Sequence, residues 1–211
     1  MPYLDRTVCS PEPIDCRILT AALELFVERG FHKVSIHDIQ KLSDVSIGSI
    51  YKHFGGKEGV AKALYDHLLN EFDELMDKIN QLEASQIEKS NELIRRLFVY
   101  TESKRDIISF VFHAKHKEFL PDESLICDEK PFLAMRGIVE KGIKGKEINA
   151  SNPIIAGATI FGSVIRLIQL RLDGVIKEPL EQHYDEITSS IWNGLGNKIK
   201  NEPKLKVINQ S

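Results

Sequence analysis

The stretch "SDVSIGSIYKHFGGKEG", residues 43–59, sets polar side chains around a short apolar frame. Ile47, Ile50 and Phe54 follow the three- and four-residue spacing of one helix face, which predicts a short amphipathic helix. Ser46 is suited to cap its first turn, and the glycines at 55 and 56 end it. The other side of the helix carries hydroxyl, phenol, ammonium and imidazole groups, on Ser49, Tyr51, Lys52 and His53.

Two further helices are predicted before this one. The first covers roughly residues 13–29 and ends at Gly30. The second is short, with Ser35 as its N-cap and Asp38 completing a capping box, and it ends near Ser43. Asp44 tolerates the irregular or left-handed backbone of the turn that follows. Two short helices joined by a tight turn, the second one polar, are typical of a helix-turn-helix unit.

The rest of the chain predicts an all-α fold, because apolar residues recur at helical spacing and strand patterns are almost absent. A long helix begins at Lys57 and runs to about residue 80, and further helices are expected near 88–101, 104–118, 130–144, 152–174 and 180–197. We expect an N-terminal arm (1–12), a three-helix helix-turn-helix domain (13–58), a second helical domain (59–197) and a polar tail (198–211).

Charge restricts where a nucleic acid can bind. The 211-residue chain has a formal net charge of −3, so the molecule as a whole repels DNA, and binding requires a local basic surface. Residues 45–62 supply one, with Lys52, Lys57 and Lys62 against Glu58 alone.

Cysteine usage and hydropathy favour a cytoplasmic protein. The three cysteines are odd in number and form no C-x-x-C pair, which argues against a disulfide framework and a zinc finger. The N-terminus has no apolar signal-peptide core. Residues 153–165 are the most apolar stretch, but Arg166 and Arg171 leave it short of a membrane span, so we expect a buried helix and no membrane partner.

Residues 17–64, "RILTAALELFVERGFHKVSIHDIQKLSDVSIGSIYKHFGGKEGVAKAL", resemble the tetracycline-repressor (TetR) family of bacterial regulators. The resemblance rests on ordered matches: Ala21-Ala22, Leu25-Phe26, Gly30-Phe31, Ser46, Gly48, Ile50-Tyr51, Phe54 and Lys57-Glu58. Two positions depart from the family pattern, where Gln40 replaces a small alanine and Asp44 replaces a turn glycine. The resemblance implies a homodimer with a C-terminal helical domain that binds a ligand, and it names no ligand.

A recognition helix needs long side chains for base edges, hydroxyls for phosphates or waters, and a small residue where its backbone nears the duplex. The helix starts near 47 and 57 also direct free N–H groups outward, which suits phosphate. Tyr51 and His53 are otherwise ordinary surface residues, and the two serines cap helices in either case. The candidate DNA-binding residues are Ser35, Ser46, Gly48, Ser49, Tyr51, Lys52, His53 and Lys57.

Aromatic residues at inward helical positions suggest an effector pocket in the C-terminal region, although such residues more often form plain core. Its ligand would be a largely apolar small molecule with His113 or His116 at a polar end. A metal site of these histidines with Cys127 or Glu118 is a weaker alternative, and we expect no metal and no cofactor. The candidate effector-binding residues are Phe72, Phe98, Phe112, His113, His116 and Phe161.

The last two helices are expected to form the dimer interface. Residues 153–172 are apolar almost all round, which requires a cover, and Ala158 and Gly162 permit close helix approach. The alternative is that both helices are used inside one subunit's core. The next helix adds the stripe Leu180, Tyr184, Ile187, Ile191 and Leu195.

Enzyme motifs are lacking. "GGKEG" is no phosphate-binding loop, because Tyr51 and Glu58 stand where such a loop needs Gly and Ser or Thr, and G-x-S-x-G, H-E-x-x-H and G-x-G-x-x-G do not occur. We therefore expect a DNA-binding transcriptional regulator, a repressor released from operator DNA by a small molecule. The alternatives are an effector-less regulator whose C-terminal bundle only dimerises, and a small-molecule-binding or catalytic helical protein whose helix-turn-helix is incidental.

Overall fold

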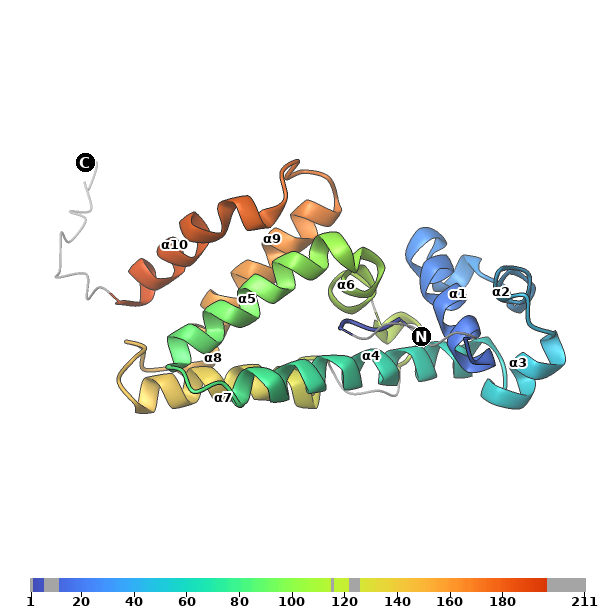
Figure 1. Cartoon of the computed structure of the whole chain (residues 1–211), viewed down its shortest axis with the longest axis horizontal. Helices are drawn as coiled ribbons and strands as arrows, with labels where there is room; N and C mark the ends of the chain where they lie inside the picture. Colours follow the sequence, from blue (N-terminus) through green and yellow to red (C-terminus); the bar gives the residue numbers. More distant parts are fainter. Residues whose placement is uncertain (1, 6–11, 115, 122–125, 197–211) are drawn as a thin grey trace, which may run out of the picture.

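The computed structural model describes residues 2–5, 12–114, 116–121 and 126–196, without the side chains of Glu118 and Cys127. Within these residues the secondary structure is helical and includes no strand, which confirms the all-α prediction. Figure 1 shows an elongated molecule with the first three α-helices at one end. The polar tail predicted for residues 198–211 lies outside the described residues.

The N-terminal unit contains α1 (Ile14–Arg29), η1 (Phe31–Lys33), α2 (Ile36–Ser43) and α3 (Ile47–Phe54). Their buried faces include Ile18, Ala22, Ile39 and Ile50, all with 0% exposure, and form the N-terminal end of a hydrophobic core that continues into the C-terminal helices. The predicted boundaries of these helices hold to within a residue, because caps and glycines fix their ends.

Helix α4 (Lys57–Asn80) connects the two ends of the molecule. It packs against α1 and α3 near its start and against α5 (Gln86–Ser103) and α7 (Lys130–Lys144) further along, as Figure 1 shows. Its buried stripe runs from Val60 to Ile79 without a break. Since the same rigid helix belongs to both packing groups, a movement of one group against the other involves α4. The domain limit at residue 58 stays a prediction.

Helix α6 (Arg105–Phe112) is shorter than the predicted helix of 104–118. The Ala114 N–H donates to the Ser109 carbonyl, five residues back, which widens and ends the helix. The chain then turns through η2 (His116–Glu118), so that His116 and Phe119 pack on Phe110 at ring distances of 5.2 and 6.1 Å. The boundary prediction was wrong here because this aromatic packing overrides helical spacing. A further turn, η3 (Ile126–Asp128), precedes α7.

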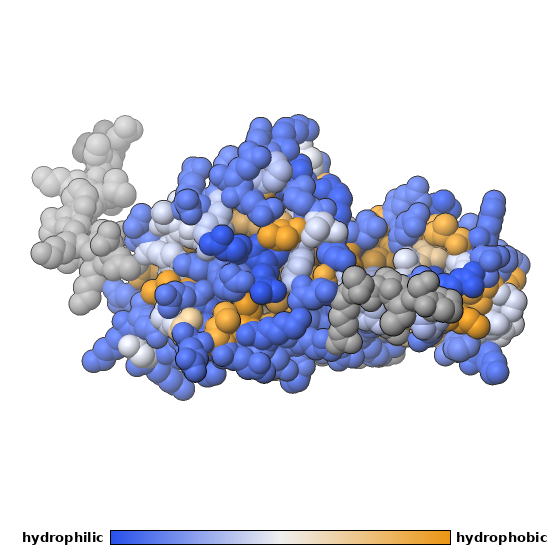
Figure 2. Space-filling model, in the orientation of Figure 1, coloured by the Kyte–Doolittle hydropathy of each residue, from blue (hydrophilic) through white to orange (hydrophobic). Residues whose placement is uncertain are grey.

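The last part of the chain forms one long helix and a shorter one. The long helix runs through α8 (Pro153–Gly157), a π-helical turn η4 (Ala158–Gly162) and α9 (Ser163–Leu172). After it come η5 (Leu180–His183) and α10 (Tyr184–Gly196). On the face drawn in Figure 2, hydrophobic residues show as small separate patches within a hydrophilic surface.

The prediction that residues 153–165 form a buried helix does not hold within a single chain. Ile154 and Ile155 are each 65% exposed, and 28% of the apolar window is buried. By length and composition the helix is also apolar enough to cross a membrane, because the two arginines lie in its second half without ending it. Against a membrane span, Arg171 near the end of this helix donates two hydrogen bonds to Glu102 of α5 and so joins the helix to the rest of the subunit.

Residues 2–5 of the predicted N-terminal arm lie on the C-terminal helices. Leu4 is 4% exposed, and its backbone N–H donates to Oε2 of the buried Glu71 on α4 at 3.0 Å. Asp5 accepts from the Tyr100 hydroxyl at 2.5 Å and from Lys78 Nζ at 2.7 Å. Burial, followed by the hydrogen bond to Asp5, raises the pKa of Tyr100 to about 12, so this hydroxyl remains a donor at neutral pH.

Candidate nucleic-acid interface

Helix α3 begins and ends at well-defined caps. Ser46 has extended backbone angles, and its hydroxyl accepts from the Ser49 N–H at 3.1 Å, as an N-cap residue does. Gly55 closes the helix in the left-handed conformation at φ 75°. Ser35 caps α2 in the same way, within a full capping box with Asp38. The caps at Ser46 and Gly55 thus fix both ends of α3, which has only eight residues.

The turn between α2 and α3 passes through Asp44, which is left-handed at φ 53°. Arg17 of α1 donates to the Asp44 carbonyl at 2.8 Å and to its carboxylate at 3.1 Å. These bonds offset the strain of a non-glycine residue in this conformation. The sequence predicts the turn but not the role of Arg17, because a contact across 27 residues leaves no local signal.

The predicted DNA-binding side chains of α3 lie on its outer side. Ile50 is fully buried, whereas Tyr51 is 53% exposed and Lys52 and His53 are also exposed. Gly48 is also exposed, and the space around its backbone is free, since a Cβ there would meet nothing closer than the Ser46 hydroxyl at 4.0 Å. The structure thus brings the side chains predicted to contact bases together on one accessible surface, as entry into a DNA groove requires.

Lys57 lies at the start of α4 and is partly engaged within the chain. Its ammonium donates to the Phe31 carbonyl at 3.1 Å and lies 4.1 Å from the centre of the Phe31 ring. An ammonium has three N–H donors, so two remain for a phosphate. Contact of Lys57 with DNA therefore stays a prediction, alongside a second role in joining α4 to η1.

Gly59 sets the angle between α3 and α4. A Cβ at this position would lie 1.7 Å from the Phe54 carbonyl oxygen, so a larger residue would force the two helices apart. This requirement is not predictable from the sequence, because the three glycines of "GGKEG" look alike as helix breakers. Only the close approach of the two helices distinguishes Gly59 from its neighbours.

Known protein families and solved structures include proteins similar to this chain, and they agree with the geometry of the helix-turn-helix unit. The family model described as bacterial regulatory proteins of the tetR family matches residues 18–64, the segment that contains α2, α3 and the start of α4. Over this segment the chain carries the helix-turn-helix of the TetR family. It is a DNA-binding transcriptional regulator of the helix-turn-helix type, and the TetR family is not an enzyme family.

Individual TetR-family relatives match at low identity. One relative, named as the probable HTH-type transcriptional regulator YttP of Bacillus subtilis, is 29% identical over 62% of this chain and 65% of its own length, which is just under two thirds. The fatty acid metabolism regulator protein of Bacillus subtilis is 24% identical over 86% of this chain and 95% of its own.

Two solved structures share the fold. One is the transcriptional regulator FadR of Bacillus subtilis in complex with stearoyl-CoA, with a TM-score of 0.73 at 23% identity over 85% of this chain and 98% of that one. The other is a TetR family regulator from Marinobacter aquaeolei VT8, with a TM-score of 0.73 at 16% identity over 86% and 95%. At these identities the likeness concerns the fold.

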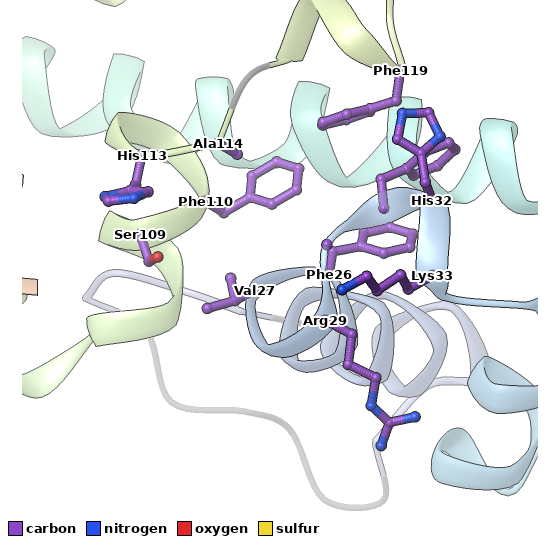
Figure 3. Close-up of a pocket in the computed structure, with 12 residues that line it drawn as sticks. Phe26, Val27, Arg29, His32, Lys33, Ser109, Phe110, His113, Ala114 and Phe119 are labelled. Carbon is purple, nitrogen blue, oxygen red and sulfur yellow. The ribbon is translucent and has the colours of Figure 1, made fainter. Parts of the chain in front are cut away.

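A pocket of about 390 Å³ lies where the helix-turn-helix unit meets the C-terminal helices. The end of α1 and η1 form one side of it, and α6 with Phe119 forms the other, as Figure 3 shows. We call this hollow the junction pocket. The side chains that matter below are Phe26, Lys33, Ser109, Phe110, His113 and Phe119.

Of the predicted effector-binding residues, His113 alone lines the junction pocket. Phe72, Phe98, Phe112 and Phe161 are each at most 9% exposed and belong to the closed core. The Phe72 and Phe112 rings pack edge to face at 5.6 Å. A cavity between these four phenylalanines would require the core to open, so their role as an effector site stays a prediction.

His116 lies behind the pocket wall. Its ring packs against Tyr65, Phe110 and Phe119, and Nε2 is buried with no hydrogen-bond partner in the described part of the chain. Burial lowers the pKa of His116, so the imidazole is neutral at pH 7. No group of three potential metal ligands occurs in the described residues, and the side chains of Glu118 and Cys127 lie outside them.

The predicted dimer residues fall into two groups. Ala158 and Gly162 are exposed on the long helix. On α10, Tyr184 and Trp192 donate to Asn91 of α5 at 3.2 and 2.7 Å, which attaches α10 to its own subunit. Ile191 is 7% exposed, whereas Ile187 and Leu195 are half-buried. A groove between α9 and α10, which includes Ile187 and Ile191, leaves apolar surface for a partner.

Proposed function

We propose that this TetR-family protein is a cytoplasmic, homodimeric repressor that a small, largely apolar molecule releases from its operator. The observation that carries the proposal is the capped helix α3, whose exposed Tyr51, Lys52 and His53 stand on the accessible side of a rigid helix-turn-helix unit. Two such helices in a dimer would enter successive major grooves, roughly 34 Å apart on B-DNA.

The regulatory half of the proposal draws on the relatives. FadR of Bacillus subtilis was solved with stearoyl-CoA, and the Mycobacterium tuberculosis relative Rv3405c, 44% identical over 57 residues, is a transcriptional repressor. Release requires only that the ligand binds better to a conformation whose recognition helices are wrongly spaced. Helix α4 is suited to transmit such a change, because it packs on α1 and α3 as well as on α5 and α7.

The experiment is a selection of bound fragments from the genomic DNA of the source organism, followed by footprinting. We expect one or a few fragments with two related half-sites, and weaker binding when stearoyl-CoA or another apolar metabolite is added. Specific binding that no metabolite weakens would favour the rival, an effector-less regulator whose C-terminal bundle only dimerises. Failure to select any sequence would contradict the proposal.

A further inference from the structure

We infer that the junction pocket is a regulatory site for a small amphipathic anion, a molecule with an apolar ring-sized body and one acidic group. The inference rests on the proposed function, because it assigns the ligand class that acts on DNA binding. Its volume of about 390 Å³ lies within the usual range of ligand pockets, about 300–1,000 Å³.

The walls of the pocket suit an apolar ring. Phe26 and Phe110 both line the hollow. They are held in the core at 6% and 1% exposure, so each offers only the edge of its ring. Phe119 stacks on Phe31 with the ring centres 4.8 Å apart and the planes at 19°. In Figure 3 the rings of Phe26 on α1, Phe110 on α6 and Phe119 just after η2 lie around the hollow. Offset or edge contacts with these rings favour an aromatic or flat apolar body.

The rim of the pocket carries a lysine, Lys33, that forms no ion pair within the described residues, unlike Arg29 and His113. Arg29 is engaged by Glu28 and Asp38 at 3.1 and 3.7 Å, and in Figure 3 its guanidinium points away from the hollow. His113 lies 3.7 Å from Asp173.

In Figure 3 the Lys33 ammonium extends along the pocket beside Phe26 toward Val27. Lys33 thus provides the charge that would receive an acidic group, and a charge-assisted hydrogen bond there is stronger than a neutral one.

Occupation of this pocket would affect the DNA-binding end through a short chain of contacts. Phe31 packs on Phe26 and Phe119, and its carbonyl holds Lys57 at the start of α4. Lys57 follows Gly55 and Gly56, which end α3. A ligand that displaces Phe31 or Phe119 therefore acts on the joint between the recognition helix and α4. The two sides of the pocket belong to the two packing groups that α4 connects.

The test uses two fluorescent probes of nearly equal shape, 1-anilinonaphthalene-8-sulfonate (the anion) and N-phenyl-1-naphthylamine (its neutral counterpart), on the full-length protein. We expect saturable binding of the anion at one site per subunit. Lys33→Met, which keeps the apolar stem, should weaken the anion about tenfold, or about 1.4 kcal/mol, and the neutral probe less than about twofold. Lys41→Met, at an exposed lysine of α2 outside the pocket, is the matched control and should change neither affinity.

A second variant fills the hollow from its other side. Ser109→Trp on α6 should remove the site for both probes, and the anion should then no longer weaken binding to the selected operator fragment. If both Lys33→Met and Ser109→Trp leave anion binding unchanged, the inference is overturned. If Lys33→Met weakens both probes equally, or neither, the acidic class of ligand is overturned. Because the titrations need no DNA, failure to find an operator would count against the proposed function and leave this test intact.

Discussion

Lys57 combines a predicted contact to a DNA phosphate with an observed hydrogen bond to the Phe31 carbonyl, and a single substitution removes both. Lys57→Ala removes a candidate phosphate contact and also the hydrogen bond to Phe31. We expect weaker binding to all sequences and a slope of log affinity against log salt lower by about one, since one phosphate contact is lost. Lys57→Met, which keeps a long unbranched side chain but removes the ammonium, should show the same slope. Weaker binding at an unchanged slope in both variants would assign Lys57 to positioning alone.

His116 gives a pH-dependent prediction. Burial places its folded-state pKa below the ordinary value of 6.5, so the unfolded chain takes up the proton first as the pH falls. The contribution of His116 to stability is therefore complete above about pH 6.5 and is lost at lower pH. In His116→Phe, the free energy of unfolding by urea should fall less between about pH 7 and pH 5 than in the parent protein. His53→Phe, at an exposed position of α3, is the control, and equal pH profiles for parent and His116→Phe would contradict the assignment.

At the scale of elements, Gly59 should be the least replaceable glycine of the joint between α3 and α4. Gly59→Ala would drive a Cβ against the Phe54 carbonyl, with a loss of about 1–3 kcal/mol in unfolding free energy and weaker operator binding. Gly137→Ala in α7 is the matched control, because a Cβ there has open space. It should stabilise the protein by up to about 1 kcal/mol, the helix-propensity gain. Equal unfolding free energies for the two variants would mean that α3 and α4 adjust without strain.

The elements also show what the sequence can predict. Helix α7 has the predicted limits of 130 and 144, because Pro131 and Gly145 mark its ends locally. The caps of α2 and α3 were predicted for the same reason. The early end of α6, the Arg17 contact to Asp44 and the junction pocket depend on residues distant in the chain. The spacing of apolar residues along one helix contains no information on such contacts. An inward helical position likewise does not tell whether a phenylalanine packs in the closed core, as Phe72 does, or lines the pocket, as Phe110 does.

At the scale of the whole molecule, the exposed apolar helix of residues 153–172 calls for a dimer. Gly162→Arg adds a charged side chain on the exposed side of that helix, where a Cβ meets only Ala158 at 3.9 Å, so the subunit itself should remain folded. We expect sedimentation to show monomers and operator binding to fall, because one half-site is held weakly. Gly137→Arg on α7 is the control and should remain dimeric. A dimer that survives Gly162→Arg would place the interface on another surface.

Direct readout of the operator by α3 can be tested by measuring the base preference of the protein at every position of the selected fragment. His53→Ala and Tyr51→Ala should each change the preferred base at the same position in both half-sites, while the overall fold, followed by helical circular dichroism, stays unchanged. Identical base preferences for the parent protein and both variants would contradict direct readout by this helix.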